Sequence, residues 1–188
     1  AIDEQNGIMT FTLSNVNVSY ANGLRRIILS EIPVIAIESY PHDKNNVTIF
    51  TNKSRLNNEL IKQRLSCIPI HIDALEDFPY NDYVLEINKS NATNLIIFIT
   101  SEDFQIKNIK TGKYLTRAEV QKIFPPDPIS GDYIDLLRLR PKLSSNNDKE
   151  QLHLEAKFSI SNAKNSGMFN VVSTCCYGNS CLLYTSPS

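Results

Sequence analysis

The sequence has few of the residues and none of the patterns on which phosphate and acyl-transfer chemistry depends. Among 188 residues there is no tryptophan and there are only six glycines. Glycine-rich loops hold phosphates because glycine lets backbone N–H groups approach the ligand, and neither a G-x-G-x-x-G nor a Walker-type pattern is present. The G-x-S-x-G and H-E-x-x-H patterns are missing as well. We therefore expect no catalytic residue, no bound cofactor and no enzymatic activity of the chain itself.

The chain also has no excess of one charge and no long apolar run. Its 19 Lys and Arg residues nearly balance its 20 Asp and Glu residues, which gives a formal net charge of −1 at pH 7. No overall field would draw such a chain to nucleic acid, so we expect protein partners and no direct, specific nucleic-acid contact. A membrane helix needs roughly 18 apolar residues, and the best run, 94–100, is far shorter. We expect no membrane partner.

Cysteine and histidine are too few and too scattered for a metal site. The cysteines are Cys67, Cys175, Cys176 and Cys181, and no histidine lies near the last three. A tetrahedral zinc site is usually made by paired C-x-x-C or similar spacings, which this arrangement lacks. Cys67 lies in an apolar segment and is expected to be a buried small hydrophobic residue. We expect no metal ligands, and thiols that stay reduced inside a cell.

The hydrophobic pattern that is present changes period along the chain and predicts both helices and strands. Apolar residues alternate in some segments and recur every three or four residues in others, and the texture after residue 82 is mostly that of strands. The predicted strands cover 11–16, 34–39, 47–51, 83–87, 95–100, 133–139 and 152–159. The predicted helices begin after caps at Asn17 or Ser19, at Asn57 or Asn58, and at Thr116, where Glu119 completes a capping box.

The first predicted helix has two distinct faces. An apolar stripe (Ala21, Leu24, Ile28 and Ile32) recurs at spacings of three and four, and Pro33 ends the helix. A second face carries Asn22, Arg25, Arg26 and Leu29. A glycine inside a helix lowers helix stability by up to about 1 kcal/mol relative to alanine. The presence of Gly23 therefore suggests that a neighbouring backbone lies close to it and leaves no room for a side chain.

Two interpretations of the adjacent arginines stay open from the residues alone. A pair of arginines on a helix is often only a solvated part of the surface. Arginine forks also suit ion pairs at interfaces, and Leu29 adds an apolar anchor to the same face. A helix with two such faces needs two partners, its own sheet and something else, and that second partner could be a protein or a phosphate backbone.

Two long motifs, about 20 residues apart and in the right order, resemble the signature of RNA polymerase alpha-like subunits. Residues 21–33 read ANGLRRIILSEIP, close to the family pattern A-N-x-L-R-R-I-x-L-S-E-x-P. Residues 52–70 read NKSRLNNELIKQRLSCIPI, close to N-x-S-x-L-x-x-E-x-x-x-x-R-L-x-x-I-P-L. The family includes bacterial alpha, its archaeal counterpart and the third-largest subunit of eukaryotic RNA polymerase II. The Asn-, Ile- and Lys-rich composition is most similar to versions encoded by large DNA viruses.

The resemblance implies an α+β fold with two domains. One is a discontinuous dimerisation domain, expected at 1–72 and 151–180, and the other is a β-rich domain inserted at 73–150. Some relatives hold zinc or an iron–sulfur cluster in the inserted domain, but 73–150 contains no cysteine here. The family's dimerisation domain ends with a long helix that does not follow here. We expect the domain to be incomplete at its C-terminus and 181–188 to be a non-native tail.

The resemblance also implies a function and a set of interface residues. The chain would be a non-catalytic scaffold that pairs with a smaller alpha-like subunit and docks the largest and second-largest polymerase subunits, in the nucleus or, if viral, in a cytoplasmic viral factory or virion. The expected contact residues are Asn22, Arg25, Arg26, Leu29 and Ser30. Glu59 and Arg64 match the second motif and are expected to be structural. The alternative is a free-standing regulatory or nucleic-acid-binding module with the same fold.

Overall fold

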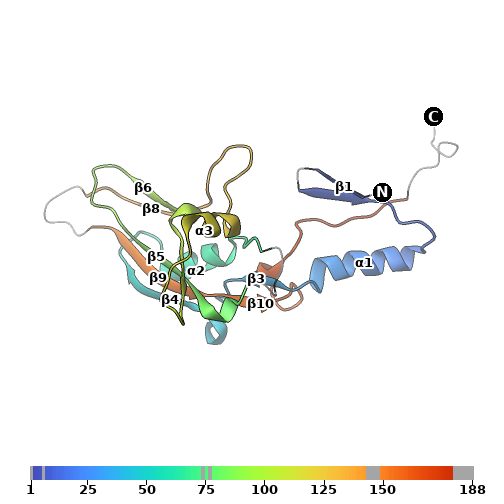
Figure 1. Ribbon diagram of the computed structural model, residues 1–188, viewed down its shortest axis with the longest axis horizontal. Helices are drawn as coiled ribbons and strands as arrows, with labels where there is room; N and C mark the ends of the chain where they lie inside the picture. Colours follow the sequence, from blue (N-terminus) through green and yellow to red (C-terminus); the bar gives the residue numbers. More distant parts are fainter. Residues whose placement is uncertain (1, 6, 73–74, 76–77, 143–148, 180–188) are drawn as a thin grey trace. The chain divides into compact units, whose positions relative to one another are not determined.

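The computed structural model describes residues 2–5, 7–72, 75, 78–142 and 149–179 (Figure 1). By its contacts the chain divides into two compact units, Val34–Ser161 and a unit made of Ala1–Pro33 with Asn162–Ser188. The expected α+β class is confirmed, because helices and antiparallel sheets occur together in one chain. Among the described residues no helix has both the length and the apolar character needed to cross a bilayer.

The unit Val34–Ser161 is built on an antiparallel sheet of four strands in the order β4-β9-β5-β7, with two smaller sheets, β6-β8 and β10-β3. Helix α2 packs against β4 and β8, and α3 packs against β7. The strands are β3 (Val34–Ala36), β4 (Val47–Asn52), β5 (Tyr83–Ser90), β6 (Ile97–Thr100), β7 (Gln105–Asn108), β8 (Asp135–Leu139), β9 (Gln151–Lys157) and β10 (Ser159–Ser161), and the helices are α2 (Asn58–Ser66) and α3 (Arg117–Ile123).

Strand alternation places the core on one face of the four-stranded sheet. Leu152, Leu154 and Ala156 of β9 are fully buried, and so are Leu85 and Ile87 of β5. The register pairs Leu85 with Ala156 and Ile87 with Leu154, so the apolar side chains of the two strands point to the same side. The core also includes the helix residues Ile61, Leu65, Val120 and Ile123.

The second unit consists of a hairpin, an α-helix and a return segment that includes a short 3-10 helix at Gly167–Phe169. Strands β1 (Ile2–Gln5) and β2 (Ile8–Phe11) are antiparallel and are joined through Gly7, whose φ of 73° favours glycine. Helix α1 (Val18–Ser30) follows. The return segment is held to the end of α1 by a bond from Lys164 N–H to the Ser30 carbonyl at 3.1 Å.

Local signals located the helices correctly, whereas some strands were misplaced. Asn17 caps α1, Asn57 caps α2, and Thr116 with Glu119 forms a full capping box on α3. The strand expected at 11–16 is wrong, because β2 ends at Phe11 and Asn15 has a left-handed φ of 61° that interrupts an extended chain. Strand β7 was missed, since its sequence contains one apolar residue only.

The expected domain boundaries remain a prediction. The boundaries between the two compact units lie at 33/34 and 161/162. The four-stranded sheet combines strands from both expected domains: β4 and β9 come from the expected dimerisation domain, and β5 and β7 come from the expected insertion. The expected non-native tail, 181–188, lies outside the described residues.

A buried asparagine joins the turn after β5 to the end of β8. Asn91 is fully buried, and its Nδ2 donates to the carbonyls of Leu95 at 2.7 Å, Leu139 at 3.1 Å and Arg140 at 3.0 Å. Its Oδ1 accepts from the N–H of Thr93 at 2.9 Å. One side chain therefore satisfies backbone groups that would otherwise be buried without partners.

We expect Asn91→Ala to lower the free energy of unfolding by about 2–3 kcal/mol, because it leaves buried carbonyls without donors. Urea unfolding of the whole chain measures this. The control is Asn88→Ala, three residues earlier on β5 and exposed, where we expect a change within about 0.5 kcal/mol. Equal effects of the two substitutions would contradict the structural role of Asn91.

Candidate subunit interface

Helix α1 begins and ends where its sequence directs. The Oδ1 of Asn17 accepts from Tyr20 N–H at 2.9 Å and satisfies one of the free donors of the first turn. At the other end, Glu31 N–H donates to the Ile27 carbonyl at 2.9 Å, two residues before Pro33. The helix therefore presents fixed faces over three turns.

The residues expected at an interface lie together on α1. Asn22 Oδ1 accepts from both Nε and Nη2 of Arg25 at 3.1 Å, which fixes the guanidinium against the helix. Arg26 is exposed, and its guanidinium has no hydrogen bond or ion pair with the described residues. Ser30 donates from Oγ to the Arg26 carbonyl at 2.7 Å, a bond internal to the helix. Leu29 is half-buried.

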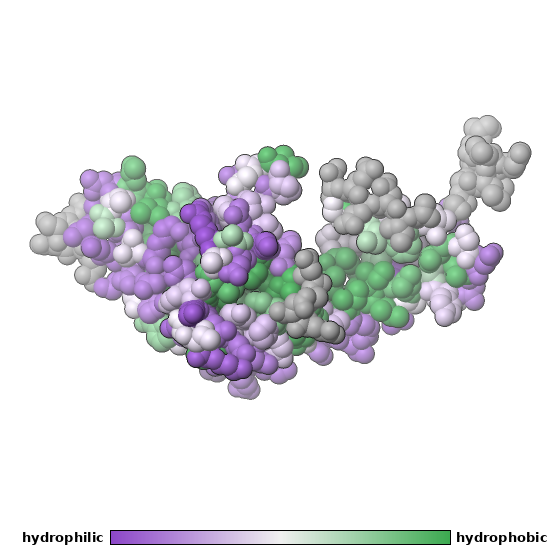
Figure 2. All heavy atoms as spheres, in the orientation of Figure 1, coloured by the Kyte–Doolittle hydropathy of each residue, from purple (hydrophilic) through white to green (hydrophobic). Residues whose placement is uncertain are grey.

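The apolar stripe of α1 lies open in this chain. No residue of the helix is buried: Leu24 of the stripe is 37% exposed, and Ala21 and Ile28 are only half-buried. Figure 2 shows apolar atoms exposed along α1. We expected this stripe to be covered by the chain's own sheet, and that is wrong for the described residues. An amphipathic helix with no buried residue has not yet met the surface that its apolar side requires.

The stripe forms one wall of a groove of about 540 Å³ with a mixed apolar and polar lining. The other walls are β2 and the loop after it, with the return segment near its end. Arg25 stands at the edge of the groove, so it connects the apolar wall with the arginine face. The apolar and aromatic lining consists of Met9, Phe11, Leu13, Val16, Val18, Ala21, Leu24, Ile28 and Tyr177, with Cys175 and Cys176 beside them.

Gly23 has no close neighbour within the described chain. The position that a Cβ would occupy there has no heavy atom within 4 Å other than those of the helix itself. The expectation of a nearby backbone is therefore wrong for this chain by itself.

Glu59 and Arg64, the residues of the second motif, lie on α2 in the other compact unit. Glu59 is an exposed residue of the first turn, where the helix dipole interacts favourably with a negative charge. Arg64 donates from Nη2 to the Asp135 carbonyl at 2.8 Å and so joins α2 to β8. This bond agrees with the structural role that we expect for Arg64, which stays a prediction together with that of Glu59.

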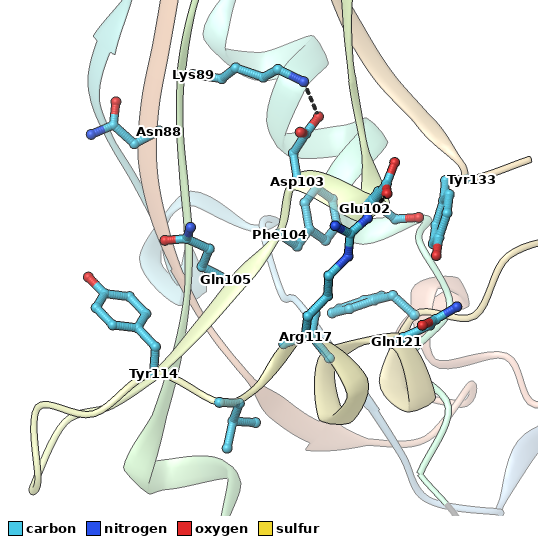
Figure 3. A pocket seen from close by; sticks show the side chains of 14 residues that line it. Asn88, Lys89, Glu102, Asp103, Phe104, Gln105, Tyr114, Arg117, Gln121 and Tyr133 are labelled. Atoms are coloured by element: carbon cyan, nitrogen blue, oxygen red, sulfur yellow. Dashed lines mark hydrogen bonds and ion pairs between the residues drawn. The ribbon is translucent and has the colours of Figure 1, made fainter.

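A second pocket, of about 740 Å³, lies in the Val34–Ser161 unit beside α3 (Figure 3). Lys89 Nζ pairs with Asp103 Oδ2 at 2.6 Å and also donates to the Phe98 carbonyl at 3.1 Å. Arg117 pairs with Glu102 across the same pocket. Each acid that lines the pocket is thus neutralised by a base of the chain, which suits a structural role better than acid–base chemistry.

The outer face of the four-stranded sheet carries a network around Glu86. Tyr114 donates from its hydroxyl to Glu86 Oε2 at 2.7 Å, and this bond is the main reason that the pKa of Tyr114 is raised. His153 Nε2 lies 3.7 Å from Glu86 Oε1, and its ring packs against Phe50. In the described part of the chain no three His, Cys, Asp or Glu side chains are arranged to hold a metal ion.

Sequence reasoning missed two parts of the groove, and it misplaced one cysteine. The hairpin β1–β2 and the return segment at 175–178 have weak periodicity, so no local pattern could assign them to the wall opposite α1. Cys67 is exposed rather than buried, because it follows the last turn of α2 on the outer side. Cys175 and Cys176 are free thiols, and Cys181 lies outside the described residues.

Comparisons with known proteins agree on one family. Residues 10–161, more than half of the chain, match the family model described as RNA polymerase Rpb3/Rpb11 dimerisation domain. A conjugation stage-specific protein of Tetrahymena thermophila is 33% identical over 119 residues, 57% of this chain and 36% of that protein. DNA-directed RNA polymerases I and III subunit rpac1 of Dictyostelium discoideum is 29% identical over 157 residues, 74% of this chain and 42% of the relative.

An archaeal relative extends this similarity. DNA-directed RNA polymerase subunit Rpo3 of Pyrococcus horikoshii is 32% identical over 111 residues, 54% of this chain and 39% of the relative. The chain therefore spans about two fifths of the length of these three relatives.

Proposed function

Because the chain belongs to the family of the RNA polymerase Rpb3/Rpb11 dimerisation domain, we propose that it is a non-catalytic assembly subunit of a DNA-directed RNA polymerase. It pairs with a smaller alpha-like subunit, and the pair docks the two large catalytic subunits. In a eukaryotic cell this function belongs to the nucleus. The observation that carries the proposal is helix α1, which is folded and capped but has no buried residue.

The groove supports the pairing step. Its lining combines apolar side chains with polar ones such as Thr10, Thr12 and Asn17, and it is formed by three separate segments of one compact unit. A groove with an apolar wall beside an exposed helix fits an amphipathic helix, which would place apolar side chains spaced by three and four residues against that wall. The smaller alpha-like subunit is the partner that we assign to this groove.

The arginine face supports the docking step. Arg25 is held by Asn22 before any partner binds, so little side-chain entropy is lost on binding. A guanidinium fixed in this way can pair with a carboxylate through two parallel bonds. Arg26 adds a second positive charge to this face, and Leu29 adds an apolar contact. We assign it to carboxylates on the second-largest polymerase subunit, and contact with the largest subunit follows from assembly of the whole complex.

The alternative, a module that binds nucleic acid through the same arginines, has less support. Phosphate binding usually relies on many basic residues spread over a face, and the net charge of the chain is −1. Steeply salt-dependent binding of DNA by the whole chain would favour the alternative over the assembly role.

We expect the double substitution Arg25→Glu, Arg26→Glu to weaken association with the second-largest subunit by at least about tenfold, because two favourable charge pairs become repulsive. The chain should remain folded, since neither arginine is buried. Co-purification of tagged chain, smaller subunit and large subunits, followed by titration, measures the effect. The matched control is Lys44→Glu, Arg55→Glu, with the same charge change at exposed positions in the other unit.

Two results would contradict this assignment. If the Arg25/Arg26 variant unfolds, as judged by circular dichroism, the pair is structural. If the control weakens assembly as much as the variant does, the effect is one of net charge and the face is not specific.

We also expect Leu24→Gln, Ile28→Gln to weaken binding of the smaller alpha-like subunit by about tenfold or more, because the groove loses its apolar wall. Isothermal titration of the purified partners measures it. Ile27→Gln, on the same helix but outside the groove, should change the affinity by less than about threefold. Equal losses for both variants would show that the groove is not where the partner binds.

A further inference from the structure

The loop between α3 and β8 presents an isoleucine to solvent. The loop projects from the Val34–Ser161 unit, and Figure 2 shows apolar atoms at its tip (Figure 1). Ile129 is 95% exposed, the highest value among the large hydrophobic side chains of the described residues. Single exposed apolar residues are common on protein surfaces, so exposure alone assigns nothing. What distinguishes Ile129 is how firmly its loop is built.

Prolines restrict the loop on both sides of one aspartate. Pro125, Pro126 and Pro128 each fix φ near −65°, which removes much of the freedom that a loop of this length would otherwise have. Backbone bonds then close the turn. Asp127 N–H donates to the Asp132 carbonyl and Gly131 N–H donates to the Asp127 carbonyl, both at 2.8 Å.

The Asp127 carboxylate holds the tip from inside. Its Oδ1 accepts from the N–H groups of Ile129 and Ser130, both at 2.8 Å. These backbone bonds lower the pKa of Asp127 below its usual value, so the side chain is ionised at neutral pH. Gly131 has a φ of 74°, a left-handed conformation that glycine adopts readily, and it completes the turn.

These bonds hold the loop in one conformation, although the side chain at its tip packs against no other part of the described chain. The backbone of the loop is fixed, yet the side chain that it presents is almost wholly in solvent. A rigid loop with an apolar tip loses little entropy when that tip enters a pocket, which is the property of a binding anchor. The acids Asp127 and Asp132 stand on either side of Ile129 in the turn and give the rim of the tip a negative charge.

We propose that this loop is a docking element whose Ile129 side chain enters an apolar pocket, rimmed by Lys or Arg side chains, on another subunit of the polymerase. This assignment rests on the proposed function, which identifies the assembly as an RNA polymerase. It adds a second contact, carried by the Val34–Ser161 unit, to the contacts that we assign to α1. The charge of the rim selects a basic surface, and the isoleucine supplies the apolar anchor.

The test compares Ile129→Ser with Ile109→Ser in the assembled complex. Ile109 is also an exposed isoleucine, 53% exposed, in a turn that a side chain caps, because Asn108 Oδ1 accepts from the N–H groups of Lys110 and Thr111 at 3.0 Å. Its turn contains no proline, so the comparison isolates the contribution of the proline-restricted loop. We expect Ile129→Ser to raise the dissociation constant of the full chain for the remaining co-expressed polymerase subunits by about tenfold or more. Ile109→Ser should change it by less than about threefold.

Two further measurements separate the anchor from its rigid support. Asp127→Ala keeps the isoleucine but removes the internal acceptor, and we expect weaker binding at an unchanged fold because the loop must then be ordered on binding. Alkylation of Ile129→Cys, followed peptide by peptide in the mass spectrometer, should slow by about tenfold or more on assembly. Ile109→Cys should keep its rate.

The outcomes distinguish this inference from the proposed function. If the wild-type chain assembles and Ile129→Ser assembles equally well, the docking loop is wrong and the assembly role stands. If the wild-type chain binds none of the subunits, both fall. If Ile129→Ser changes only self-association of the chain in sedimentation, a second copy is the occupant and the inference is overturned.

Discussion

The position of β9 between β4 and β5 is the constraint on which the Val34–Ser161 unit depends. It pairs with β4 on one side and with β5 along its whole length on the other. Its three inward residues, Leu152, Leu154 and Ala156, are fully buried and join the apolar faces of both neighbours. A shift of register by one residue would turn all three to solvent and would bring His153 and Glu155 into the core. The helices α2 and α3, the polar pocket and the loop before β8 are all positioned by this arrangement.

The other compact unit differs, because the apolar surface of its helix is left uncovered. Helix α1 is well capped, but a helix in a protein owes most of its stability to packing of its apolar face. The hairpin and the return segment border that face without burying any residue of the helix. The exposed apolar area of α1 and the fixed Arg25 guanidinium support the association that we propose for this unit. An independent domain, by contrast, covers its apolar surface with its own segments.

Preorganisation connects the two interaction surfaces that we assign. Arg25 is held by Asn22 on α1, and Ile129 is held by Asp127 and three prolines in the loop before β8. In both cases an amide or carboxylate oxygen of the chain satisfies donors that would otherwise have to be ordered when a partner binds. The entropic cost is then met during folding, and more of the contact energy appears as affinity.

The sequence by itself determined the local features of this protein. The caps at Asn17, Asn57 and Thr116, the end of α1 before Pro33 and the family motifs depend on residues within a few positions of one another, so pattern and spacing were sufficient to predict them. Only the tertiary structure decided that β9 lies between β4 and β5, that β7 exists, that the α1 stripe stays open beside β2 and 175–178, and that Ile129 stands alone in solvent. Strand partners and exposure depend on segments that can be more than a hundred residues apart, as Val47 and Ala156 are, and no local period in the sequence records which distant segment covers which face.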